Sequence, residues 1–103
     1  MERLFEGKVV LITSAACAIG REVAFSYATN GAFVIVSDKA DDKTVNKIKA
    51  NGGKAVFIKS DVSQAPECKR LLNQIISIYG RLDIACNNGG VINNTVDLIY
   101  TYL

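Results

Sequence analysis

The sequence contains no histidine and no tryptophan, and only one proline and three cysteines among its 103 residues. Without histidine, the usual His and Cys ligands of a zinc site are not available, so we predict no metal site. The cysteines are odd in number and show no Cys-x-x-Cys spacing, which argues against the disulfide framework of a secreted domain. We therefore expect a cytoplasmic protein with reduced cysteines that act as small hydrophobic residues.

The chain also lacks a strong charge of either sign. Twelve basic and ten acidic residues give a net charge of +2, and Lys69-Arg70 is the only adjacent basic pair. A basic surface for nucleic acid is therefore not expected. The apolar run Val9–Ile12 is too short to span a membrane, and the segment before it has as many acidic as basic residues, unlike a signal peptide. We predict neither nucleic acid nor a membrane as a partner.

What the chain does contain is a regular alternation of two kinds of apolar segment. Four are short and rich in β-branched residues, as in strands buried on both faces, and they cover residues 8–13, 32–36, 55–58 and 82–86. Three helical patterns lie between them, near residues 19–30, 41–51 and 64–79, with Ser63 as the expected N-cap of the last. This order predicts an α/β fold with a parallel sheet of four strands and three helices, in one domain over residues 1–103.

The segment from Thr13 to Gly20 joins the first strand to the first helix through small residues. At such a turn, the free backbone N–H groups and the positive end of the helix dipole attract an anion, most often a pyrophosphate. A tight turn also requires small residues for structural reasons alone. The turn by itself therefore leaves both interpretations open.

Polar residues follow the other strands as well. Asp38 lies 18 residues after Gly20, where a dinucleotide-binding fold has the carboxylate that accepts hydrogen bonds from the adenosine ribose. Asp61 follows the third strand and Asn87 the fourth. Because ligands of open α/β sheets bind beyond the carboxyl ends of the strands, these residues are expected to line one crevice. The alternative is that each merely belongs to a connecting loop.

Together these segments resemble the short-chain dehydrogenases/reductases. The stretch from Thr13 to Gly20 is similar to the TGxxxGIG turn of that family, and Asp38 matches its ribose carboxylate. Asp61-Val62 resembles the pair that contacts adenine, and the segment from Asn87 to Gly90 resembles the Asn-Asn-Ala-Gly motif. The likeness extends to about Val91, which is nearly the whole chain.

The resemblance implies a Rossmann-type sheet of strand order 3-2-1-4 and a dinucleotide as the partner. The turn would contact the pyrophosphate, Asp38 the adenosine ribose, and Asp61 the adenine. The carboxylate of Asp38 favours NAD over NADP because it repels a 2′-phosphate. The adjacent cation Lys39 opposes this preference slightly, since a positive charge there tolerates the 2′-phosphate. The residues implied in cofactor binding are Ser14, Cys17, Ala18, Ile19, Gly20, Asp38, Asp61, Val62, Asn87, Asn88 and Gly89.

The sequence departs from its family in two respects. Ser14 and Ala18 replace two glycines of the turn, so each adds a Cβ where backbone approaches phosphate. The family's catalytic Ser and Tyr-x-x-x-Lys follow the fourth strand, and no tyrosine here has a lysine four residues later. We therefore interpret the chain as the truncated cofactor-binding half of an oxidoreductase that acts on an alcohol or ketone, and expect it to be inactive alone.

Two alternatives remain open from the sequence. One is a non-catalytic module that binds a nucleotide or pairs with a full-length relative, and the other is a gene product without a function of its own. Truncation would make the fourth strand an edge strand with an apolar flank, through which we expect self-association.

Overall fold

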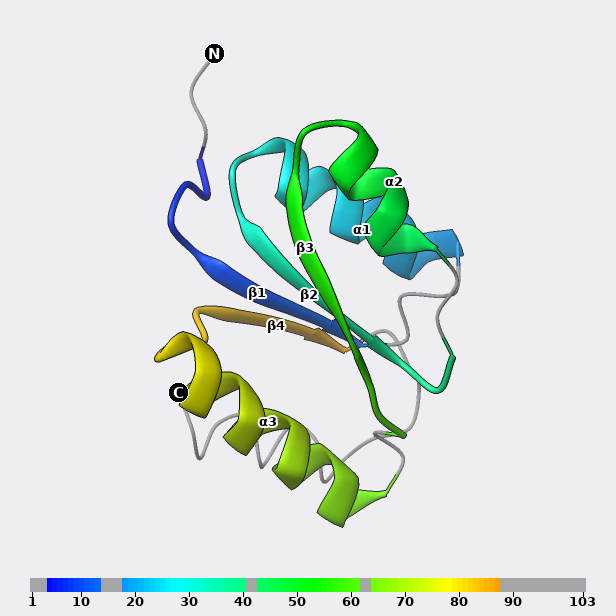
Figure 1. Ribbon diagram of the computed structural model, residues 1–103, viewed down its shortest axis with the longest axis vertical. Helices are drawn as coiled ribbons and strands as arrows, with labels where there is room; N and C mark the ends of the chain where they lie inside the picture. Colours follow the sequence, from blue (N-terminus) through cyan, green and yellow to red (C-terminus); the bar gives the residue numbers. More distant parts are fainter. Residues whose placement is uncertain (1–3, 14–17, 41–42, 62–63, 88–103) are drawn as a thin grey trace.

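The computed structural model describes residues 4–13, 18–40, 43–61 and 64–87. Its elements alternate in the predicted order, and Figure 1 shows them as a single sheet between two layers of helices. The strands are β1 (Val9–Thr13), β2 (Phe33–Asp38), β3 (Lys54–Lys59) and β4 (Ile84–Asn87). The helices are α1 (Ala18–Thr29), α2 (Thr44–Ala50) and α3 (Ala65–Tyr79).

All strand pairs of the sheet are parallel, and the order is β3-β2-β1-β4, which confirms the predicted fold class. In the register, Thr13 of β1 lies opposite Ser37 of β2 on one side and Asn87 of β4 on the other. Asp38 pairs with Lys59 of β3, so the ladder continues through it. Asp38 is therefore the last residue of β2 and not, as predicted, a residue just beyond it.

The helices divide between the two faces of the sheet, as Figure 1 shows: α1 and α2 cover one face, and α3 alone covers the other. Alternate residues of each strand therefore enter two separate cores. Leu11 and Ile35 pack with the α3 residues Leu71, Leu72 and Ile75. On the opposite face, the buried side chains that pack together with α1 and α2 include Val10, Ile12, Ala24, Val34, Val36 and Ile48.

Two predicted helix starts need correction. The helix expected from about residue 41 begins at Thr44, because Lys43 before it has a left-handed backbone (φ 72°). The N-cap of α3 is Gln64 and not Ser63, since the Gln64 carbonyl accepts the first helical hydrogen bond, from the N–H of Cys68. Gln64 makes no side-chain capping bond. The predicted end of α3 is confirmed, because Gly80 adopts a left-handed conformation (φ 77°) and its N–H donates to the Ile76 carbonyl.

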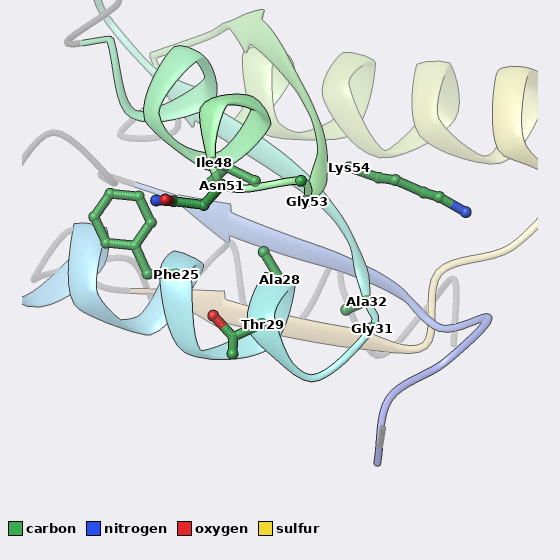
Figure 2. Close-up of a pocket in the computed structure, with 10 residues that line it drawn as sticks. Phe25, Ala28, Thr29, Gly31, Ala32, Ile48, Asn51, Gly53 and Lys54 are labelled. Atoms are coloured by element: carbon green, nitrogen blue, oxygen red, sulfur yellow. The ribbon is translucent and has the colours of Figure 1, made fainter. Parts of the chain in front are cut away.

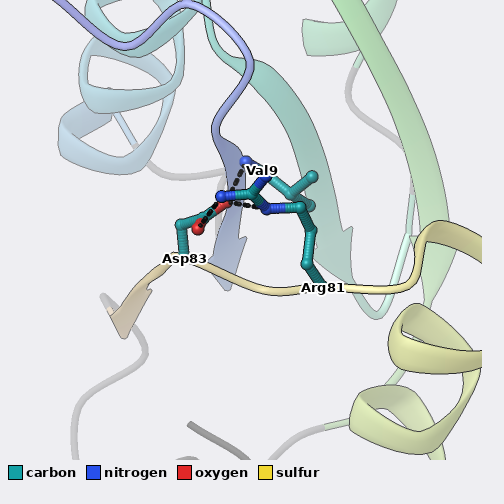
Figure 3. Close-up of polar contacts among 3 residues, drawn as sticks. All are labelled: Val9, Arg81 and Asp83. Atoms are coloured by element: carbon teal, nitrogen blue, oxygen red, sulfur yellow. Dashed lines mark hydrogen bonds and ion pairs between the residues drawn. The ribbon is translucent and has the colours of Figure 1, made fainter.

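β4 is attached to β1 by a polar contact at its amino end, shown in Figure 3. The carboxylate of Asp83 accepts hydrogen bonds from the backbone N–H of Val9 and from the guanidinium of Arg81. This contact fixes where the β1–β4 pairing begins, and so helps to set the register at the far, carboxyl end.

Candidate functional site

The candidate site lies at the carboxyl ends of the strands, where β1 is the point at which the strand order reverses. From β1 the chain proceeds outward through β2 to β3, whereas β4 is added on the other side of β1. In open parallel sheets, such a switch point leaves a crevice because the adjoining loops go to opposite faces. The candidate ligand site is therefore the edge beyond Thr13 and Asn87, which are neighbours in the register.

Thr13 holds the ends of these two strands together. Its side chain is buried, and its hydroxyl Oγ1 donates a hydrogen bond of 3.4 Å to the backbone carbonyl of Cys86. A threonine suits this position because its β-branched carbon packs in a strand while its hydroxyl satisfies a carbonyl group at the strand end. The carboxyl ends of β1 and β4 are therefore linked through a buried threonine hydroxyl.

The first turn of α1 contributes the positive end of a helix to this edge. Its residues include no acidic side chain, so nothing in that turn opposes a bound anion. Gly20 is buried and Ile19 is 71% exposed, so the glycine faces the protein and the isoleucine faces outward. Ala18 begins the helix, whereas Ser14 and Cys17 lie outside the described residues.

Two carboxylates mark the ends of the neighbouring strands β2 and β3. The Asp38 carboxylate accepts the backbone N–H of Lys39 at 2.7 Å, and the Asp38 carbonyl accepts the N–H of Ser60 at 2.9 Å. Asp61 follows directly, and its Oδ2 lies 3.9 Å from the ammonium nitrogen of Lys39. The structure thus brings Asp38 and Asp61 to adjacent positions at one edge, as predicted from the sequence.

A cavity of about 360 Å³ opens beside Asp61. It combines three basic side chains with two acidic ones, and Arg70 and Glu67 form an ion pair within it. Its lining residues are Lys39, Lys59, Ser60, Asp61, Glu67 and Arg70. The edge is therefore polar on the α3 side, with mixed charge and room for a polar group.

A second cavity, of about 210 Å³, lies at the opposite edge of the sheet and is shown in Figure 2. It is bordered by the last turns of α1 and α2 and by the residues that precede β2 and β3, among them Phe25, Ile48 and Gly53. The amino ends of the strands meet there. Because neither the helix N-terminus of α1 nor Asp38 faces this edge, we do not assign the site to it.

Of the remaining predicted site residues, the described ranges include one. The backbone of Asn87 ends β4 beside Thr13, whereas Val62, Asn88 and Gly89 lie outside the described residues. The described groups suit a dinucleotide: a helix N-terminus without acidic residues for the pyrophosphate and a carboxylate at the next strand end for the ribose hydroxyls. Within the described ranges, no three potential ligand residues gather around a metal position.

Sequence reasoning did not identify Ser37 or the contact between Lys39 and Asp61. Ser37 is fully buried opposite Thr13, and its hydroxyl has no hydrogen-bond partner in the part of the chain that the structure describes. A polar residue in the otherwise apolar run of 33–37 was the available signal. The ion pair could not be predicted, because it depends on how two loops approach each other.

None of the described helices combines the length and the apolar character needed to cross a membrane. Two of the cysteines lie in the described ranges: Cys68 is buried and Cys86 is partly buried, which fits their expected role as small hydrophobic residues.

Comparison with known proteins gives one consistent family. The sequence model described as short chain dehydrogenase matches residues 8–100. An uncharacterised oxidoreductase of Thermotoga maritima is 42% identical over 91 residues, which are 85% of this chain and 36% of that protein. The chain thus spans about a third of the length of this curated relative.

Solved structures show the same relationship. A hydroxysteroid dehydrogenase from Escherichia coli superposes with a TM-score of 0.79 at 37% identity, over 86% of this chain and 39% of that one. A metagenomic short-chain oxidoreductase in complex with NADP superposes with a TM-score of 0.80 at 28% identity, over 84% and 41% of the two chains.

Proposed function

This chain belongs to the short-chain dehydrogenase family, whose members are oxidoreductases that bind NAD(P), and we propose that it binds NAD at the carboxyl edge of its sheet. The observation that carries the proposal is the position of Asp38. It ends β2, adjacent to the strand whose turn leads into α1, which is where an adenosine ribose lies when its pyrophosphate rests on that helix.

The roles of the residues follow from this placement. The backbone N–H groups at the start of α1, with Ser14, Cys17, Ala18 and Ile19, would bind the pyrophosphate, and Gly20 would keep the helix close to β1. Asp38 would accept hydrogen bonds from the ribose hydroxyls, and Asp61 with Val62 would bind the adenine. Asn87, Asn88 and Gly89 would border the cofactor from β4.

The preference for NAD rests on electrostatics. A carboxylate that accepts a 2′-hydroxyl proton repels a 2′-phosphate, which carries close to two negative charges at neutral pH. When bound, the nicotinamide supplies or accepts a hydride in the interconversion of an alcohol and a ketone. The described residues hold and orient the dinucleotide, and this chain corresponds to the cofactor-binding portion of its longer relatives.

The experiment is a calorimetric or fluorescence titration with NADH and NADPH. NADH should bind more tightly, and Asp38→Ala should narrow the difference by weakening NADH and strengthening NADPH. Glu6→Ala, which removes the same charge before β1 at the other end of the sheet, is the matched control and should leave both affinities unchanged. Equal or tighter binding of NADPH by the unmodified chain would refute the preference, and no binding of either would refute the function.

A further inference from the structure

We propose that Asp61 enforces the preference for NAD by holding the ammonium group of Lys39 away from the adenosine 2′ position. The inference rests on the proposed function, since it concerns the same cofactor edge. It is carried by the ion pair between Lys39 and Asp61 and by the place of Lys39 directly after Asp38.

The backbone brings Lys39 close to both carboxylates. The Asp38 carboxylate is fixed at the end of β2 by the N–H of Lys39, at 2.7 Å. The chain ends of β2 and β3 are joined by the bond from the Ser60 N–H to the Asp38 carbonyl, so Asp61 follows one residue beyond that link. The Asp61 carbonyl accepts the N–H of Gln64 at 3.1 Å, which links Asp61 to the residue directly before α3.

The position of the Lys39 side chain decides whether a positive charge lies near the adenosine 2′ position. Its four-carbon stem is flexible and 71% exposed, so its ammonium group can reach either the ribose edge or the loop after β3. Asp61 is only 33% exposed, and its carboxylate is screened less than a fully solvated one. The ion pair at 3.9 Å therefore keeps the cation on the β3 side, where it cannot offset the repulsion between Asp38 and a 2′-phosphate.

An alternative cause of a change in NADPH affinity on substitution of Asp61 is the overall charge of the neighbouring cavity. The cavity also contains Lys59 and Arg70, so removing the charge of Asp61 makes the whole cavity more positive. A stronger attraction for phosphate would then not require Lys39 to move. The two explanations differ in whether the effect of Asp61 depends on the presence of Lys39.

The test is a double-mutant cycle with NADH and NADPH titrated against the unmodified chain, Asp61→Asn, Lys39→Met and the double variant. Loss of an adenine contact affects both cofactors equally, so the ratio of the two dissociation constants isolates the 2′ position. Asp61→Asn should shift that ratio about fivefold toward NADPH, the size expected for one exposed charge contact. Lys39→Met alone should not shift it toward NADPH, and the double variant should lose the gain.

Asp61→Glu is the conservative control. It keeps a carboxylate within reach of Lys39, so the ratio should stay near that of the unmodified chain, and melting curves on the same samples show that each variant is folded. A ratio that does not change in Asp61→Asn, or a gain that persists in the double variant, overturns the inference while leaving NAD binding intact. Absence of binding by every form overturns the proposed function itself.

Discussion

Asp83 and Val9 form a reciprocal pair of hydrogen bonds although 74 residues separate them. The Val9 N–H donates to the Asp83 carboxylate at 2.8 Å, and the Asp83 N–H donates to the Val9 carbonyl at 2.9 Å. Arg81 adds two further bonds to the same carboxylate, at 2.9 and 2.6 Å. Together with the Thr13 bond to Cys86, this contact attaches β4 to β1 at both ends of the pairing.

Substitution of Asp83 should therefore destabilise the fold through the loss of two interactions, the hydrogen bond from Val9 and the ion pair with Arg81, which different variants separate. Asp83→Ala leaves the N–H of Val9 without its acceptor in a largely buried position, at a cost of about 1–3 kcal/mol. Asp83→Asn keeps an acceptor oxygen for that N–H and loses the ion pair with Arg81, so it should cost less. Urea unfolding measures both, and Arg81→Met is the control that removes the exposed partner alone. Equal losses for Ala and Asn would show that the bond to Val9 contributes little.

The same group predicts how stability depends on pH. The hydrogen bonds from Arg81, and then from the Val9 N–H, lower the pKa of Asp83 below its ordinary value. A carboxyl group with a lowered pKa in the folded state stabilises the fold above its unfolded pKa of about 3.9. That contribution is lost as the pH falls through the folded pKa. The difference in unfolding free energy between the unmodified chain and Asp83→Asn should therefore be constant near neutral pH and shrink below about pH 4.

The sequence was sufficient to predict the fold because its signals are local and repeated. Continuous apolar runs, such as the one at Val9–Thr13, occur where a strand is buried on both faces. Glycine is a common helix terminator because it adopts the left-handed backbone, as Gly80 does at the end of α3. The strand order came from the family resemblance and is confirmed. Helix starts were less accurate, because Lys43 and Gln64 adopt non-helical backbones that no side-chain preference indicates.

The candidate site was predictable to a smaller extent. The placement of Asp38 and Asp61 at one edge could be predicted because each lies at the carboxyl end of a strand, and parallel strands end at one edge. The pairing of Lys39 with Asp61 and the isolation of the Ser37 hydroxyl depend on distances between loops and strands, which periodicity does not contain. The preference for NAD or NADP also depends on such distances around the cofactor, and it stays a prediction.

Because α3 alone covers one face of the sheet, alanine substitutions on its buried and exposed sides should differ strongly in their effect on stability. Ile75 is fully buried against the sheet, whereas Ile78 on the same helix is 58% exposed. Ile75→Ala should cost about 2–5 kcal/mol because no other described helix covers that face to close the resulting void. Ile78→Ala should change stability by less than about 0.5 kcal/mol. Thermal or urea unfolding of both variants tests this, and similar losses would mean that α3 is not fixed on the sheet as described.

The turn before α1 predicts an opposition between affinity and stability. Ser14 and Ala18 each add a Cβ where the family has glycine, close to the expected pyrophosphate. If the NAD-bound turn requires a left-handed backbone at Ser14, a Cβ there costs about 1–2 kcal/mol, so the double variant Ser14→Gly/Ala18→Gly should tighten NAD binding about five- to thirty-fold. The added backbone freedom of the unfolded chain should lower the melting temperature. Unchanged affinity in a folded double variant would contradict phosphate binding at this turn.

The adjacent glycines between α2 and β3 are needed for different reasons, and a set of four variants separates them. Gly52 has a left-handed backbone (φ +83°) with open space around it, so its requirement is conformational. Gly53 has no such backbone, but a Cβ there would lie 2.7 Å from Cγ2 of Ile48 and 3.3 Å from Cβ of Ala28, which border the cavity of Figure 2. Its requirement is therefore close packing of α1, α2 and the start of β3.

Alanine should destabilise the protein at both positions, by about 1–2 kcal/mol at Gly52 and about 1–3 kcal/mol at Gly53. Asparagine distinguishes them, because it tolerates the left-handed region but occupies more space. Gly52→Asn should thus recover much of the stability lost in Gly52→Ala, whereas Gly53→Asn should be at least as unstable as Gly53→Ala. Unfolding free energies of the four variants measure this. Recovery by asparagine at Gly53 would show that Ile48 yields into the neighbouring cavity, and so that close contact with Ile48 is not what requires glycine there.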